Sequence, residues 1–118
     1  MKKFLAIYIG TTEAFERSGW NALPETTKKE REAAGMKAWM EWGEKHGRAI
    51  VDHGAPLGKT KRTDAQGVAG IKNNMAGYAI VQAESHEAAA KLFEGHPHFT
   101  IFPGESVEIM ECLPMPTP

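Results

Sequence analysis

The sequence of 118 residues contains a single cysteine, Cys112, so no disulfide bond can form within the chain. It has little net charge, −1, and its basic residues form no stripe, which removes the electrostatic basis for nucleic-acid binding. No stretch approaches the roughly 20 apolar residues that span a bilayer. We therefore expect no nucleic-acid partner and no membrane association. The lone cysteine suits a reducing compartment, so we expect a cytoplasmic protein.

The bulk composition is that of an ordinary globular domain. Apolar residues make up 42% and charged residues 25% of the chain, and this length is typical of one domain, here residues 1–118. The opening lysines and the apolar run to Ile9 resemble the start of a signal peptide. The run is too short for the apolar region of such a peptide, and no small-residue cleavage site follows. We expect a first strand over residues 4–9 instead.

Apolar runs and helix signals alternate along the rest of the chain. Further strands are expected over residues 49–51, 78–83 and 107–112. Residues 11–25 are less regular, with one helical turn near 12–17 and then a loop. A second helix should follow the N-cap Ser85 and end at Gly95, since Pro97 prevents its continuation.

The clearest predicted helix covers residues 27–45. Thr27 and Glu30 have the spacing of a capping box. One apolar stripe at helical spacing should face the core and consist of Met36, Trp39, Met40 and Gly43. Residues 58–76 show almost no periodicity and predict a mobile loop, with a short pairing near 68–71. Residues 113–118 contain three prolines and predict an extended tail.

This order predicts an α+β, ferredoxin-like β-α-β-β-α-β fold, with a four-stranded antiparallel sheet and two helices on one face. The first strand is apolar on both faces, because Leu5, Ile7 and Ile9 alternate with Phe4, Ala6 and Tyr8. Helices can cover only one face, and a second copy stacked sheet against sheet would cover the other. We therefore expect a homodimer through the open sheet face; the alternative is that loop 58–76 and the tail cover it.

Four segments, taken in order, resemble the YCII-related family of small dimeric α/β-barrel proteins. They are the opening strand, Gly47-Arg48-Ala49-Ile50 running into Gly54-Ala55-Pro56-Leu57, Gly77-Tyr78-Ala79-Ile80-Val81-Gln82-Ala83-Glu84-Ser85 with Glu87-Ala88-Ala89, and His96-Pro97-His98. The resemblance implies a ferredoxin-like dimer and, for some members, small-molecule enzymes with a helix histidine and an aspartate as acid/base pair. Here Met36 stands at the histidine position and His96 at the aspartate position, so that pair is not carried over.

His96 and His98 flank Pro97 just beyond a predicted helix end, where side chains reach pockets. Imidazole titrates near neutrality and suits acid/base catalysis. Asp52 and His53 close the second strand and point to opposite faces, so one of them can share a cleft with the other histidines. The alternatives are local packing for His96 and His98, and a hydrated strand end for Asp52 and His53.

The remaining motifs give weaker indications of function. The candidate metal ligands, which are His46, Asp52, His53, His96 and His98, show no recognised ligand spacing, and we expect no metal and no cofactor. The Gly54–Gly58 segment with Lys59 has three residues between its glycines, where a phosphate-binding loop needs four. Cys112 is expected to be a small core or interface residue.

Two functions follow from these residues. The first is a small-molecule enzyme with histidine acid/base chemistry, of the lyase, dehydrochlorinase or isomerase type, acting on an apolar or aromatic ligand. In it His98 or His96 transfers the proton and Asp52 or His53 assists. The second is a non-catalytic homodimeric ligand-binding or accessory domain.

Overall fold

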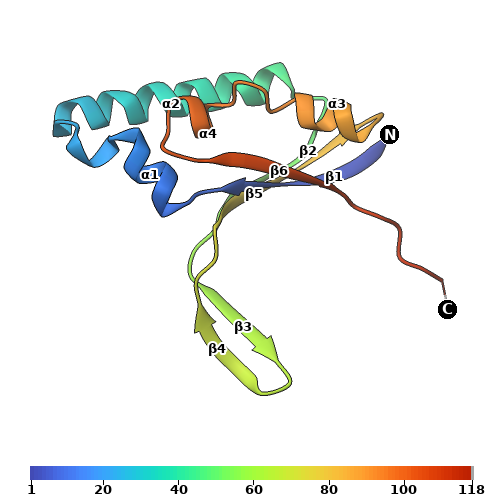
Figure 1. Cartoon of the computed structure of the whole chain (residues 1–118). Helices are drawn as coiled ribbons and strands as arrows, with labels where there is room; N and C mark the ends of the chain where they lie inside the picture. The colour runs from blue at the N-terminus through green and yellow to red at the C-terminus, as the bar shows by residue number, and fades with distance from the viewer. Residues whose placement is uncertain (118) are drawn as a thin grey trace.

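The computed structural model describes residues 1–117, which form one antiparallel sheet, one separate hairpin and a layer of helices (Figure 1). The elements in chain order are β1 (Lys2–Ile9), α1 (Thr12–Ser18), the 3-10 turn η1 (Trp20–Ala22), α2 (Glu25–Lys45), β2 (Ile50–Pro56), β3 (Thr60–Asp64), β4 (Gly67–Ile71), β5 (Met75–Ala83), α3 (His86–Lys91), α4 (Pro97–Thr100) and β6 (Ser106–Glu111).

The four-stranded sheet has the order β2-β5-β1-β6, and every neighbouring pair is antiparallel. The long helix α2 and the short helices α3 and α4 lie on one face of this sheet, and no helix within residues 1–117 covers the opposite face (Figure 1). The predicted ferredoxin-like α+β fold is confirmed, including its antiparallel sheet and its single helical face.

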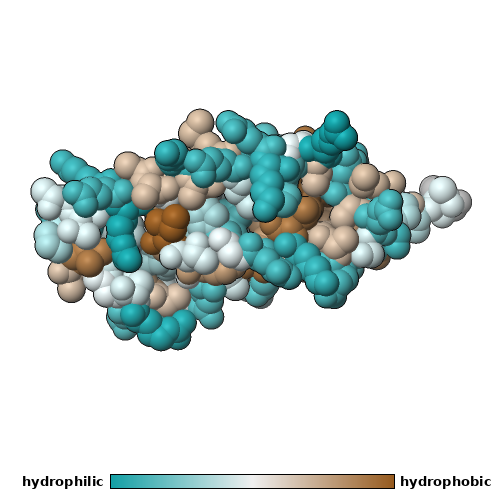
Figure 2. Space-filling view, turned by 90° about the horizontal axis from the view of Figure 1, so that it is seen from above, coloured by the Kyte–Doolittle hydropathy of each residue, from teal (hydrophilic) through white to brown (hydrophobic). Residues whose placement is uncertain are grey.

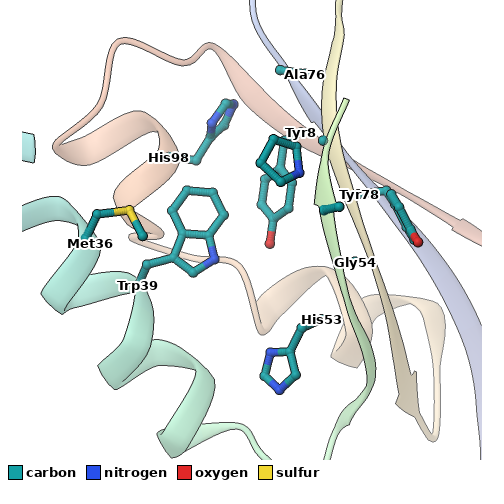
Figure 3. A pocket seen from close by; sticks show the side chains of 11 residues that line it. Tyr8, Met36, Trp39, His53, Gly54, Ala76, Tyr78 and His98 are labelled. Carbon is teal, nitrogen blue, oxygen red and sulfur yellow. The ribbon is translucent and has the colours of Figure 1, made fainter. Parts of the chain in front are cut away.

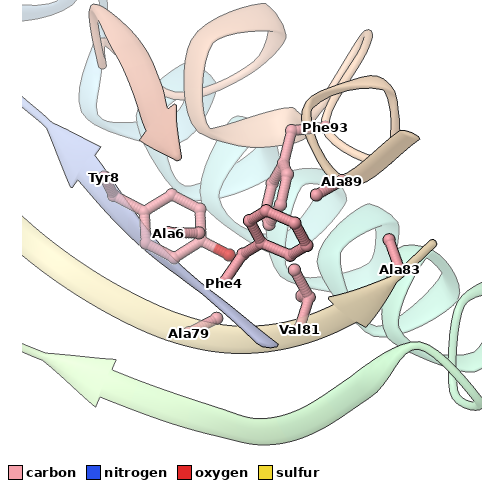
Figure 4. Packing of buried hydrophobic residues seen from close by; sticks show 8 residues of the cluster. All are labelled: Phe4, Ala6, Tyr8, Ala79, Val81, Ala83, Ala89 and Phe93. Carbon is pink, nitrogen blue, oxygen red and sulfur yellow. The ribbon is translucent and has the colours of Figure 1, made fainter. Parts of the chain in front are cut away.

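The core lies between the sheet and the helices (Figure 4). Side-chain alternation directs one set of β1 residues and one set of β5 residues toward α3 and the segment after it. The buried cluster consists of Phe4, Ala6, Tyr8, Ala79, Val81, Ala83, Ala89 and Phe93. Ser85 caps α3 as expected, because its hydroxyl accepts a hydrogen bond from the backbone N–H of Ala88, at 3.1 Å.

The inward face of α2 differs from the prediction. The helix begins at Glu25, directly after Pro24, and not at a Thr27 cap. Met36 and Met40 are 55% and 65% exposed, so the predicted stripe through them is wrong. The inward stripe follows positions i, i+4, i+7 and i+8 and consists of Gly35, Trp39, Trp42 and Gly43. Two glycines let the helix approach its neighbours, while the two indoles supply the apolar contact.

The prediction for residues 58–76 is right in part: the expected pairing near 68–71 is present as β4, but its partner is β3, so the segment forms a hairpin and not an irregular loop. The strands pair from Thr60–Ile71 to Asp64–Gly67, and the Asp64 carboxylate accepts a hydrogen bond from the N–H of Gln66 in the turn. β3 is mainly polar, β4 consists of glycine, alanine, valine and isoleucine, and both strands are largely exposed, so the sequence of this segment shows no regular apolar alternation. The hairpin projects from the sheet on the side opposite the helices (Figure 1).

Several smaller predictions also change. Residues 12–18 form a full helix, and α4 follows His96 where only a turn was expected. Strand β2 continues past Gly54 to Pro56. Cys112 is exposed rather than a core residue of the chain. The last strand ends at Glu111, one residue earlier than predicted. Residues 113–117 of the predicted tail contain no helix or strand, and Pro118 lies outside the described residues.

The open sheet face keeps the apolar side chains that the sequence placed there. Leu5, Ile7, Ile9, Tyr78 and Ile80 are half-buried on this face. The chain measures 57 × 42 × 19 Å, and its radius of gyration of 16.4 Å exceeds the roughly 13.5 Å of a compact domain of this length. The hairpin extends outward instead of folding over the sheet (Figure 1).

The helical side has a different surface. Seen from above the helices, it is covered mainly by polar side chains with scattered apolar atoms between them (Figure 2). Within residues 1–117, no helix has both the length and the apolar character that crossing a membrane requires.

Candidate functional site

A pocket of about 260 Å³ lies between α2 and the sheet, next to the carboxyl end of β1 (Figure 3). Its lining includes Tyr8, Met36, Trp39, His53, Gly54 and His98. Two of the four predicted site residues, His53 and His98, therefore share one pocket. The other two, His96 and Asp52, do not line it.

His98 lies in α4 and is 8% exposed. Its Nε2 atom is 2.8 Å from the backbone carbonyl oxygen of Ile9, and because a carbonyl can only accept, Nε2 carries the proton. Burial lowers the pKa of His98, although backbone hydrogen bonds to Ile9 and Ser106 act in the opposite direction. The imidazole is therefore neutral at pH 7, and Nδ1 is the ring nitrogen that can accept a proton.

His96 is fully buried and serves as the N-cap of α4. Its Nδ1 accepts a hydrogen bond from the backbone N–H of His98, at 3.0 Å, so the proton is on Nε2. Burial, together with the charges of His98 and His46, lowers the pKa of His96 from 6.5 to about 4. The ring packs edge-to-face with Trp39 and Trp42, at centroid distances of 4.5 and 4.6 Å. His96 therefore caps α4 and packs against the two indoles, and it does not line the pocket.

His53 reaches the pocket because β2 contains a bulge. The register of β2 against β5 shifts on both sides of Asp52, and Gly54 has a φ of 69°. A Cβ atom at Gly54 would overlap the carbonyl group of Tyr78, so only glycine fits there. The bulge places the exposed His53 ring beside α2, next to Gly43.

Asp52 stabilises this bulge instead of orienting an imidazole. Its Oδ1 accepts a hydrogen bond from the backbone N–H of Gly54, at 2.8 Å. The carboxylate is exposed and makes no hydrogen bond to His53, His96 or His98 in the described structure. Asp52 therefore acts on the pocket through the backbone that carries His53.

Sequence reasoning placed Tyr8 with Phe4 and Ala6 on one apolar face of the first strand and missed its place in the pocket. Tyr8 is 4% exposed, and its hydroxyl has no hydrogen-bond partner among the described residues. Burial raises its pKa well above the ordinary value of 10, so the group stays protonated. Tyr8 lines the pocket, and its ring lies 4.9 Å from the Trp39 ring, measured between centroids, whereas its hydroxyl oxygen is closed off from solvent. The available signal was a hydroxyl at a core-facing strand position.

The rest of the lining is apolar. Trp39 and Met36 come from α2, and the Met36 sulfur faces the same space (Figure 3). No group of three or more histidine, cysteine, aspartate or glutamate side chains within residues 1–117 is placed to hold a metal ion. The site thus combines the neutral imidazole of His98, the exposed imidazole of His53 and the phenol ring of Tyr8 in an apolar pocket.

No family model and no curated protein sequence matches the chain. Among solved structures, it is similar to 5-chloro-2-hydroxyhydroquinone dehydrochlorinase from Burkholderia phenoliruptrix AC1100, in complex with 2,5-dihydroxybenzoquinone. The TM-score is 0.52 and the sequence identity 16%, over 92% of this chain and 90% of the other. At this identity the likeness shows the fold alone, and it agrees with the ferredoxin-like α+β fold predicted from the sequence.

Proposed function

We propose that the protein is a YCII-related enzyme that moves a proton on a small aromatic or apolar molecule bound between α2 and the sheet. The observation that carries the proposal is the pairing of His98 and His53 in one largely apolar pocket. A few polar groups in an apolar cavity are typical of sites for small organic ligands. The reaction type is elimination or isomerisation, which needs a base and an acid but no cofactor.

The two histidines suit different parts of such a reaction. His98 is neutral and its tautomer is fixed by the carbonyl of Ile9, so it provides a defined base at Nδ1. His53 is exposed at the pocket rim, where it can exchange protons with water and return one to the substrate or the leaving group. Asp52 assists by holding the bulge under His53. A direct catalytic role for His96 remains a prediction that its full burial does not favour.

We further propose that the protein acts as a homodimer through the open sheet face. The apolar residues of that face form a flat surface on a molecule only 19 Å thick, and the hairpin does not cover them (Figure 1). Stacking two such faces would remove these side chains from water, which stabilises association by about 25 cal/mol per Å² of apolar area. Light scattering coupled to size exclusion measures the mass directly; a monomer at micromolar concentration would contradict the proposal.

The second candidate is a non-catalytic ligand-binding domain. It is favoured by the fact that backbone groups already engage one ring nitrogen of each buried histidine: His98 bonds to Ile9, and His96 caps α4. In that case the imidazoles shape the pocket without exchanging protons. The two candidates make the same binding prediction and differ in turnover.

The test uses 5-chloro-2-hydroxyhydroquinone as trial substrate and measures chloride release, with 2,5-dihydroxybenzoquinone as a binding probe. Wild type is compared with His98→Gln and His53→Gln. The control is His86→Gln, because the exposed His86 bonds to the carbonyl of Ile109 away from the pocket. We expect turnover to fall at least about a hundredfold in the two pocket variants and to persist in the control.

Binding of the quinone without chloride release from wild type would favour the non-catalytic domain. Equal turnover in wild type and both pocket variants would remove the histidines from the mechanism. If wild type neither binds the quinone nor turns over the chlorinated substrate, the proposed ligand class is contradicted.

A further inference from the structure

We propose that the hairpin of β3 and β4 is an arm that docks onto a second copy of the chain, with its lysines beside the edge strand β6 of that copy. This inference rests on the proposed homodimer, and it adds the contact that aligns the two copies. It gives a role to a segment that takes no part in the proposed proton transfer.

The hairpin has little support from its own chain. Within residues 1–117 its two strands pair only with each other, and every residue from 61 to 70 is exposed. A two-stranded ribbon is marginally stable at best when nothing packs against it. In addition, β4 carries no charged side chain and no proline that would block its free edge. These features are typical of a segment that another chain covers.

Positive charge is concentrated in the hairpin. Its only carboxylate, Asp64, already pairs with Arg62, at 3.3 Å. Three lysines line one groove of about 740 Å³ at the base of the hairpin and make no ion pair within residues 1–117: Lys59, Lys61 and Lys72. The surface that best covers this hairpin is therefore acidic.

The chain carries the complementary charge at the opposite edge of its sheet. Strand β6 forms that edge, and Glu105 and Glu108, at its start, are exposed. No lysine or arginine follows Lys91 in the sequence, and neither carboxylate makes an ion pair in the described part of the chain. Glu108 lies opposite Ile7 of β1, so its side chain is on the open sheet face. A stacked copy that covers this face would have to supply a cation.

The positions of these charges select one direction for the twofold axis. When two sheets stack with aligned strands, the axis can run along the strands or across them. An axis along the strands places the β2 edge of one sheet over the β6 edge of the other. The base of the hairpin and the start of β6 are at the same end of the sheet, since Ile9 is paired with both Met75 and Ser106. Each hairpin would then lie beside Glu105 and Glu108 of the partner subunit.

The other direction brings like charges together. An axis across the strands places the hairpin of one copy beside the start of β2 in the other. The exposed Lys45 and Arg48 lie just before that start in the sequence, so they would repel the lysines of the hairpin. Charge complementarity therefore favours the axis along the strands.

The hairpin is also long enough for this contact. Each of its strands has five residues, which corresponds to about 17 Å, whereas stacked sheets lie about 10 Å apart. It projects on the side of the open sheet face (Figure 1). A hairpin of this length would therefore extend past the edge of a sheet stacked on that face.

The experiment reverses the charge on each side of the contact in the full-length protein. The hairpin variant is Lys59→Glu/Lys61→Glu, and the edge variant is Glu105→Lys/Glu108→Lys. Glu108→Lys alone is a second edge variant, because the Glu105 carboxylate also accepts a hydrogen bond from the Thr11 hydroxyl. Sedimentation equilibrium gives the Kd of each homodimer. Native mass spectrometry of an equimolar mixture, with one variant isotopically labelled, separates homodimers from heterodimers.

We expect each reversed variant to raise the Kd of its homodimer at least about tenfold, since every contact occurs twice in a twofold dimer. The mixture should form mainly heterodimers, because each reversed surface then meets the opposite charge. A chain with all four substitutions should dimerise within about threefold of wild type. The control, Lys29→Glu/Lys37→Glu, makes the same change of charge at exposed positions of α2 and should leave the Kd unchanged.

Unchanged Kd values, or a statistical mixture of homodimers and heterodimers, would overturn the inference. A hairpin variant that dimerises weakly and is not rescued by the edge variants would overturn it as well, because another surface would then be its partner. Inorganic phosphate is the probe for a competing role of the lysine groove. If phosphate binding is lost in the hairpin variant while the Kd stays the same, the groove is an anion site and the inference fails.

Failure of the proposed homodimer gives a different result. A monomeric wild type removes both the dimer and the docked hairpin. A dimeric wild type that responds to neither charge reversal removes only the hairpin contact and leaves the open sheet face as the interface. Chloride release tests the enzymatic proposal separately, because none of the substituted residues lines the pocket.

Discussion

Ile9 and His98 are joined by a hydrogen bond of 2.8 Å although 89 positions separate them in the sequence. The same Ile9 carbonyl accepts the backbone N–H of Glu105, at 2.9 Å. One oxygen atom therefore connects the end of β1, helix α4 and the segment that leads into β6. This junction fixes both the tautomer and the position of His98 at the pocket.

Gly104 should be essential for that junction. A Cβ atom at this position would overlap both the His98 ring and the His98 carbonyl oxygen, and a backbone atom cannot move aside as a flexible side chain can. We expect Gly104→Ala to lower the free energy of unfolding by about 2–4 kcal/mol and to abolish ligand binding, as measured by denaturation and by NMR titration. The control is Gly70→Ala in the hairpin, where a Cβ atom meets nothing within 4 Å. Equal stability of the two variants would contradict the junction.

Gly54 should be essential for the bulge that carries His53. Its φ of 69° and the overlap of any Cβ atom with the Tyr78 carbonyl both act against a side chain. We expect Gly54→Ala to lose at least about 3 kcal/mol of stability, measured by chemical denaturation. Gly58→Ala is the matched control in the adjoining segment, since it has open space around it, and it should stay within about 0.5 kcal/mol of wild type. A stable Gly54→Ala protein would mean that the bulge adapts.

The buried His96 predicts a loss of stability in acid. Its pKa is about 4 in the folded protein and 6.5 in the absence of burial, so the unfolded chain binds more protons between these values. The contribution of neutral His96 to the free energy of unfolding is therefore fully present above about pH 6.5 and is lost as the pH falls toward 4. We expect His96 to account for about 2 kcal/mol of the loss between pH 7.5 and 5, measured by urea denaturation across that range.

His96→Asn isolates this contribution. Asparagine is a good N-cap and can still accept the backbone N–H of His98, but it does not titrate. The variant should show a flatter dependence of stability on pH than wild type, with the remaining slope due to groups such as His98 and His46, whose pKa values burial also lowers. Parallel curves for variant and wild type would show that His96 is not the responsible group.

We expect dimerisation through the open sheet face to be sensitive to substitution of Ile80. This residue lies in β5 opposite Leu5 of β1, on the face without helices. We expect Ile80→Lys to convert the proposed dimer into monomers, because burying an unpaired ammonium costs several kcal/mol. Met40→Lys is the control, since Met40 is 65% exposed on α2, and it should leave the mass found by light scattering unchanged. Dimers in both variants would place the interface elsewhere.

Prediction from the sequence succeeded where a local pattern was sufficient. The alternation in residues 4–9 correctly separated Phe4, Ala6 and Tyr8 from the open-face residues. Ser85 was recognised as a cap from its own chemistry and its neighbours. It failed where small residues decide the packing: on α2, Gly35 and Gly43 are buried, while Met40 is exposed and Met36 lies at the pocket instead of in the core. Hydrophobicity ranks methionine above glycine, whereas close approach of the helix requires the reverse.

The sequence alone determined the order of the four sheet strands and of the two main helices, the two apolar faces of the sheet, and the candidate histidines, because each of these follows from side-chain type and spacing along a short segment. Only the tertiary structure decided which histidines share a pocket. His53 reaches it through a bulge, His98 through a carbonyl 89 positions away, and His96 is withdrawn by burial. Those outcomes depend on contacts between distant segments, where excluded volume and unpaired hydrogen-bonding groups select one arrangement that no local pattern encodes.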